Sequence, residues 1–176
     1  MTQIINNEAY SSSWEHISDE LYRLELRIRL LLTIKQGIQE TESPFEQYKG
    51  LVLSEEEVYQ LLDDSSYVVY NDSVMNPIKD ELAHLEYKIK KRLALSTKKG
   101  IFLPLAYLVD VFCLSPFEEH CLITCLAVEL ERKYEKFYAF LQDDVTCKRP
   151  SVDLVMQLFC ITPEEKLFAR LSFVVG

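Results

Sequence analysis

Apolar residues recur at helical spacing in two long stretches of the chain. The first stripe alternates gaps of three and four residues and consists of Trp14, Ile17, Leu21, Leu24, Ile28 and Leu31. The second stripe has similar spacing and consists of Met75, Ile78, Leu82, Leu85 and Ile89, with Leu93 continuing the same face. Such spacing is typical of a helix with one apolar face. It predicts a helix from Trp14 to Gln36, ended by Gly37, and a second helix from Met75 to just before Gly100.

Charge along the two predicted helices indicates how they pair. The first helix is acidic over residues 15–20 and basic over residues 23–29. The second helix is acidic at residues 80–81 and basic over residues 88–92. Antiparallel packing places each acidic start beside a basic end, whereas parallel packing brings like charges together, and that repulsion selects the antiparallel orientation. The two apolar stripes are therefore predicted to meet in an antiparallel hairpin within one chain.

Ser/Thr-x-x-Glu patterns mark four helix starts. They begin at Ser12, Ser54, Ser115 and Thr162. In such a capping box the hydroxyl accepts a hydrogen bond from the amide of the glutamate, and the carboxylate accepts one from the amide of the capping residue. Pro116 and Pro163 follow two of these caps, at a helix position where no N–H is needed.

Short helical segments are predicted throughout the second half of the chain. Their ranges are Leu103–Phe112, Pro116–Glu129, about Leu130–Leu141, Val152–Phe159 and Pro163–Phe173. A polar turn, QDDVTCKRPS, separates two of them. Between the two long helices the sequence predicts a short helix, Ser54–Leu62, and a brief strand at YVVY, residues 67–70. Short helices joined by a polar turn are typical of helix-turn-helix and winged-helix modules.

The composition favours the same fold class. The chain has only 4 glycines and 6 prolines, fewer than the many turns of an all-β domain usually require. The predicted fold is mainly α. It has an antiparallel helical hairpin with an inserted short helix in residues 1–100, followed by a winged-helix-like helical domain in residues 101–176.

The N-terminus, the apolar segments and the cysteines bear on the compartment. The N-terminal sequence MTQIINNEAYSSS has neither the basic nor the apolar segment of a signal peptide. The most apolar run, IFLPLAYLVDVFCL, is short and contains Asp110, so no membrane span is expected. The 5 cysteines are an odd number and irregularly spaced, which is typical of a reducing compartment. We expect a cytoplasmic protein without a membrane partner.

One stretch, Ser115–Tyr134, suggests either a metal or redox site or a core helix, because it contains His120, Cys121 and Cys125. A structural zinc site usually takes four ligands in two closely spaced pairs, and the sequence offers no second pair. Free cysteine is among the most buried residue types. The stretch is predicted to be a core helix with both cysteines packed inside, and no metal is expected.

Motifs for catalysis are missing from the sequence. There is no G-x-x-x-x-G-K-[ST] loop, and four scattered glycines do not form a phosphate cradle. Adjacent acidic pairs, such as Glu118 and Glu119, point to different sides of a helix and suit helix starts or turns. No catalytic residue and no cofactor are therefore expected in this chain.

The charge balance disfavours nucleic acid as a partner. The formal net charge is -9, although residues 85–100 carry an excess of basic side chains. The segment 152–159, the candidate recognition helix, has no basic residue, and only Gln157 could read a base edge. Protein is the expected partner. The candidate contact residues are Lys88, Lys91, Arg92, Lys98, Lys99, Lys148 and Arg149.

Three phrases in the second half resemble a known family. They are LSPFEEHCLITCLAVEL at Leu114–Leu130, YAFLQDDVTCKRPSVDLVMQLF at Tyr138–Phe159 and TPEEKLFARLSF at Thr162–Phe173. The segment is similar to the winged-helix region ahead of the ATPase core in a family of bacterial AAA-family ATPases. Some members of that family accompany phage-tail-like contractile injection systems.

The resemblance implies a non-catalytic N-terminal module of an AAA-family ATPase, which recruits partners or substrates or controls assembly. Its partner would be another protein or the ATPase core of its own full-length chain, and oligomers would form through the ATPase domain. A different reading of the same sequence is a DNA-binding winged-helix regulator that dimerises through its heptad helices. The acidic balance and the missing basic recognition helix favour the first reading.

Overall fold

The computed structural model describes residues 8–39, 72–160 and 162–175, and all regular secondary structure in these ranges is helical. This confirms the mainly α prediction. The predicted short helix at Ser54–Leu62 and the strand at 67–70 lie outside the described residues. The helices are α1 (Ser13–Gln39), α3 (Asp72–Lys98), α4 (Pro104–Val111), α5 (Pro116–Leu130), α6 (Lys133–Leu141), α7 (Val152–Phe159) and α8 (Pro163–Val175).

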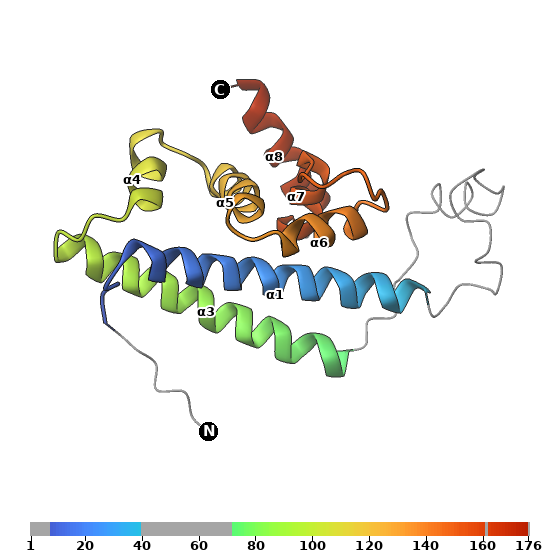
Figure 1. Ribbon diagram of the computed structural model, residues 1–176, viewed down its shortest axis with the longest axis horizontal. Helices are drawn as coiled ribbons and strands as arrows, with labels where there is room; N and C mark the ends of the chain where they lie inside the picture. Colours follow the sequence, from blue (N-terminus) through green and yellow to red (C-terminus); the bar gives the residue numbers. More distant parts are fainter. Residues whose placement is uncertain (1–7, 40–71, 161, 176) are drawn as a thin grey trace.

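Helices α1 and α3 lie side by side and run in opposite directions (Figure 1). The ion pairs between them follow the predicted charge gradient. Lys88 Nζ lies 3.1 Å from Asp19 Oδ1, and Arg27 Nη2 lies 2.8 Å from Glu86 Oε1. The acidic start of α1 thus meets the basic end of α3, which confirms the antiparallel pairing.

Gly37 does not end the first helix, contrary to the sequence prediction. Helix α1 continues to Gln39. Glycine inside a helix costs about 1 kcal/mol relative to alanine, and that penalty is too small to stop a helix whose apolar face is packed over most of its length.

The second half of the chain forms a layer of short helices that covers the face of α1 opposite α3 (Figure 1). The five segments predicted from Leu103 onward all form helices, and α7 has the predicted ends. Helix α6 begins at Lys133, three residues later than expected. The long helix α1 is therefore the middle element of the fold.

The apolar stripe of α1 packs against this second layer rather than against α3, which corrects the predicted seam-to-seam contact. Leu21, Leu24 and Ile28 belong to a buried cluster with Ala127 of α5 and Leu154 of α7. Heptad spacing identifies the apolar face of a helix, but it does not identify the partner of that face.

Helix α3 instead meets a different face of α1. Its stripe residues Leu82, Leu85 and Ile89 form a separate cluster with Leu26, which lies outside the predicted stripe. Trp14, the first member of that stripe, is 56% exposed. Helix α1 therefore has two apolar faces, each packed in its own buried cluster.

The predicted helix caps form where the structure describes them, with one difference. Ser115 and Glu118 make a reciprocal capping box. The Glu165 amide donates to Thr162 Oγ1 at 3.2 Å, and the Glu165 carboxylate accepts from the Thr162 amide at 3.1 Å. At the first helix the carboxylate of Glu15 accepts instead from the Ser11 amide and hydroxyl, each at 2.8 Å.

Candidate functional site

The candidate recognition helix, α7, is part of the core. Leu154, Val155, Met156 and Leu158 are all buried, and the helix packs against α1 and α5. The Gln157 amide donates to Asp153 Oδ2 at 2.6 Å within the same helix. Because this helix has no basic residue of its own, it lacks the Arg and Lys side chains that most often contact base edges.

Arg92, one of the predicted contact residues, is used inside the fold. Its side chain is 3% exposed, and its guanidinium lies 3.0 Å from Asp19 Oδ2 and also pairs with Glu15. The same group lies 4.0 Å from the centre of the Tyr10 ring, and its Nε donates to the Glu8 carbonyl at 3.1 Å. Arg92 therefore has no free donor face for a partner, and the prediction for this residue is corrected.

The other candidates on α3 fall into two groups. Lys88 pairs with Asp19, and Lys91 is half-buried with its Nζ 5.9 Å from the Tyr87 ring centre. Lys98 and Lys99 are exposed at the C-terminal end of the helix. In the described part of the chain, neither Lys98 nor Lys99 makes an ion pair. These two remain available to a partner.

The last two candidates, Lys148 and Arg149, lie in the loop between α6 and α7, away from the end of α3 (Figure 1). Lys148 Nζ lies 3.9 Å from Glu135 Oε2, and Arg149 pairs with Glu129. Both side chains are exposed. The structure thus does not bring the seven predicted contact residues together into one site.

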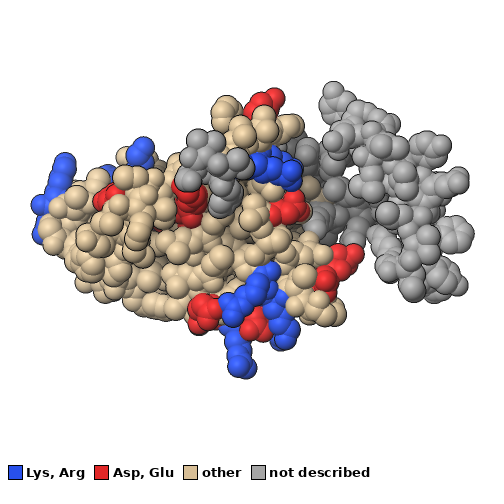
Figure 2. All heavy atoms as spheres, turned by 90° about the horizontal axis from the view of Figure 1, so that it is seen from above, with Lys and Arg blue, Asp and Glu red and all other residues tan. Residues whose placement is uncertain are grey.

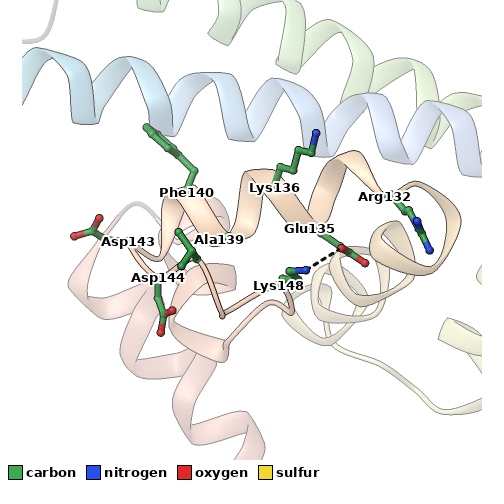
Figure 3. Close-up of a pocket in the computed structure, with 9 residues that line it drawn as sticks. Arg132, Glu135, Lys136, Ala139, Phe140, Asp143, Asp144 and Lys148 are labelled. Atoms are coloured by element: carbon green, nitrogen blue, oxygen red, sulfur yellow. Dashed lines mark ion pairs between the residues drawn. The ribbon is translucent and has the colours of Figure 1, made fainter. Parts of the chain in front are cut away.

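A pocket of about 560 Å³ lies along α6 and the loop after it. Phe140, which is 68% exposed, gives it an apolar wall. Arg132 stands near the start of α6, and Asp143 and Asp144 follow its end (Figure 3). Three basic and three acidic side chains line this pocket. Because the charges balance, the pocket lacks the concentrated positive charge that phosphate binding uses.

A broad exposed apolar surface is formed by α4 together with Phe102 before it and Phe112 directly after it. Its members are Phe102, Tyr107, Leu108, Val111 and Phe112, and they are 66%, 53%, 38%, 52% and 66% exposed. We call these residues the α4 face. Figure 2 shows a broad, largely uncharged area over this end of the molecule, with Lys and Arg side chains at its margin.

Sequence reasoning missed the α4 face. The segment 101–114 is apolar almost throughout, so periodicity gave no polar side to point outward. The available signal was an excess of apolar positions. Helix α4 makes its main packing contact with α1, and Leu105 is the residue of this helix that becomes buried. Packing against α1 covers one side of α4, and the apolar residues on its other sides stay exposed.

The cysteines of α5 are not core residues, which corrects the sequence prediction. The buried side chains of this helix are Ile123, Thr124, Ala127 and Val128. Cys121 is half-buried and Cys125 is exposed. Burial raises the pKa of the Cys121 thiol to about 11, so this thiol is protonated at neutral pH. Among the described residues, no group of three or more His, Cys, Asp or Glu side chains is placed to hold a metal ion.

A buried ionic cluster joins α1 to α5. Glu20 is 1% exposed, and its Oε2 lies 2.6 Å from Arg23 Nη2. Arg23 Nη2 also lies 3.7 Å from Glu119 Oε1, and His16 Nε2 lies 3.6 Å from Glu20 Oε1. The cluster is closed to solvent around Glu20, and the Arg23–Glu119 pair is its contact between α1 and α5.

His120 is stacked on Phe159, with the ring centres 4.0 Å apart. Burial, together with the nearby charges of Arg23 and Arg27, lowers the pKa of His120 to about 3. The folded chain therefore keeps this imidazole neutral at a pH where the unfolded chain, with a histidine pKa near 6.5, takes up a proton.

We expect stability to fall as the pH is lowered below about 6.5, with a contribution from His120 of up to about 1.4 kcal/mol per pH unit. His120→Gln removes this proton uptake and flattens the profile. Urea unfolding of both proteins at pH 7.5, 6.0 and 5.0 measures the effect. If the free energies of unfolding of the two proteins changed with pH in parallel, His120 would have the same pKa in the folded and the unfolded chain.

The comparisons with known proteins give one finding. A family model described as "Winged helix domain, variant" matches residues 2–174. No curated protein and no solved structure matches the chain significantly. None of the helices in the described ranges combines the length and apolar character needed to cross a membrane. The match confirms the winged-helix prediction, and a domain of this class binds DNA or protein. The division at residues 100 and 101 stays a prediction.

Proposed function

Since the chain belongs to the winged helix domain, variant, family, we propose that it is a protein-contacting, non-catalytic module. In this proposal it is the N-terminal part of an AAA-family ATPase, where it recruits partners or substrates or controls assembly. The proposal assigns this chain no catalytic residue, metal or cofactor, and it places the protein in the cytoplasm.

One observation carries the choice of protein over DNA. The helix that would read bases, α7, has no basic residue and four buried apolar ones. Two of the basic side chains on α3, Lys88 and Arg92, are already paired with acidic residues of α1. The α4 face, in contrast, presents five large apolar side chains to solvent. Exposed apolar surface of this kind typically marks protein contact.

The link to an ATPase rests on resemblance. The phrases at Leu114–Leu130, Tyr138–Phe159 and Thr162–Phe173 resemble the region ahead of the motor in bacterial AAA-family ATPases. The gene region after codon 176 tests this link directly. A Walker A loop in the same reading frame supports it, and an uninterrupted reading frame without one contradicts it.

We expect any DNA binding to be weak, independent of sequence and steeply dependent on salt, as non-specific phosphate contact is. The measurement is a duplex titration at about 150 mM salt, a physiological ionic strength, for the wild type and for Lys91→Glu/Lys98→Glu/Lys99→Glu. Arg92 is left unchanged because it is buried. The variant should abolish the residual binding.

Sequence-selective binding at nanomolar concentrations would overturn the proposal in favour of a DNA-binding regulator. That alternative also needs free heptad stripes for dimerisation. The stripe of α1 is covered by α5 and α7, and the stripe of α3 is covered by α1. Deletion of residues 1–176 from the full-length protein gives the positive test, because a partner that co-purifies with the intact protein should be lost.

A further inference from the structure

We propose that the α4 face binds a second copy of this chain, as a twofold-symmetric dimer in which the two α4 helices lie antiparallel. This inference goes beyond the proposed function. It concerns self-association through residues outside the heptad stripes, and it holds whether or not an ATPase domain follows. Three observations lead to it: the shape of the apolar stripe, the charges at its two ends and its area.

The α4 face is a continuous stripe along one side of the helix. Tyr107 and Val111 are separated by one helical turn, and so are Leu108 and Phe112, so the four side chains form two adjacent rows. Phe102 extends the stripe past the N-terminal end, with its ring centre 5.4 Å from that of Tyr107. The stripe therefore has an aromatic residue at each end, which allows Phe102 of one copy to meet Phe112 of the other.

Charges at the two ends of the stripe are complementary to each other. Lys98 and Lys99, which make no ion pair with a described residue, precede the N-terminal end of α4, and Asp110 lies near its C-terminal end. The C-terminal end of a helix also carries a partial negative charge. An antiparallel pair places the lysines of each copy beside Asp110 of the other, twice. A parallel pair would place like charges together.

The area of the stripe suits a weak dimer. With the exposed fractions given above and side-chain areas of about 150–250 Å² for the aromatic residues, the stripe offers about 500 Å² in each copy. Two copies then bury about 1,000 Å², at the lower limit of specific interfaces. The net charge of -9 opposes association of two copies, but salt screens charges beyond about 10 Å. We expect a dissociation constant on the order of 10–100 µM.

Sedimentation equilibrium from about 5 to 500 µM, a range that brackets this constant, tests the proposal on the chain as it stands. Val111→Asp and Phe112→Asp, each made singly, should raise the dissociation constant at least about tenfold, because each buries a charge in the apolar contact. Phe140→Asp is the matched control, since Phe140 is 68% exposed on α6, away from the stripe. It should leave the constant within about twofold. Circular dichroism checks that each variant is folded.

A charge swap identifies the antiparallel arrangement. Asp110→Lys alone and Lys98→Glu/Lys99→Glu alone should each weaken the dimer about fivefold through like-charge contacts. An equimolar mixture of the two variants should dimerise about as tightly as the wild type. In that mixed dimer one contact is native and the other is native with its signs exchanged.

A chain that stays monomeric at about 500 µM, well above the expected constant, overturns the proposal. So does a dimer that is insensitive to Phe112→Asp, or a mixture of the charge variants that is no tighter than either variant alone. None of these results bears on the DNA titration or the deletion test, so the dimer and the proposed function can fail independently.

Discussion

Leu24→Ala will lower the free energy of unfolding by about 3 kcal/mol, within the range of about 2–5 kcal/mol measured for buried leucines. Leu24 is fully buried. It belongs to the cluster in which α1 meets α5, α6 and α7. The truncation removes apolar contacts between α1 and the layer of short helices and leaves a cavity in this cluster.

Urea unfolding followed by circular dichroism and by fluorescence measures this effect, because the only tryptophan, Trp14, reports on α1. Both signals should shift together, since the cluster spans both halves of the chain. Leu167→Ala, at a residue that is 59% exposed, is the matched control and should cost less than about 0.5 kcal/mol. Two separate transitions, with only one displaced by Leu24→Ala, would instead show that residues 1–100 and 101–176 unfold independently.

Arg92→Ala will also destabilise the chain by about 3 kcal/mol, because removing one partner of a buried ion pair leaves the other without compensation. Asp19 forms an ion pair with Arg92, and the Tyr10 ring lies against the Arg92 guanidinium. The Tyr10 amide also donates to Ser96 Oγ at 2.9 Å, one helical turn further along α3. Loss of the guanidinium therefore releases the segment before α1 from the end of α3.

The effect of Arg92→Ala depends on pH. The Ser11 amide and then Arg92 lower the pKa of Glu15 from 4.5 to about 2. A lowered carboxyl pKa contributes stability above the unfolded value, and that stability is lost as the pH falls through the folded value. Wild type and variant should therefore differ most above pH 4.5 and converge as the pH falls toward 2.

Thermal unfolding at pH 7 and pH 3 measures this difference. Lys91→Ala is the control, because Lys91 is the neighbouring cation and is only half-buried. Arg92→Lys separates charge from geometry, since an ammonium group cannot satisfy Asp19, Glu15 and the Glu8 carbonyl together. An unchanged melting temperature for Arg92→Ala would show that the buried pair is neutral in energy.

Local sequence signals predicted the helices well. The caps at Ser115 and Thr162 formed as expected, because a hydroxyl and a carboxylate three residues apart satisfy amides within the same turn. The orientation of α1 and α3 was also predictable, since each helix changes from acidic to basic along its length. In each case the interacting groups are close in sequence or are arranged as a long gradient.

Tertiary pairings were less predictable. The apolar stripe containing Leu21 and Leu24 needs a partner, and the structure places the second layer there. The spacing of the apolar residues is the same whether α3 or the second layer covers them, so it does not identify the partner. Leu26 fell outside the predicted stripe, because it belongs to the second apolar face of α1. Arg92 was predicted to be available to a partner, because its burial depends on Tyr10 and on acidic residues more than 70 positions away in the sequence.

The central place of α1 has a mechanical consequence. The helix has 27 residues, which is about 40 Å at 1.5 Å per residue. It packs against α3 on one side and against the layer of short helices on the other. A rod held in this way resists bending and cannot slide without breaking contacts on both sides.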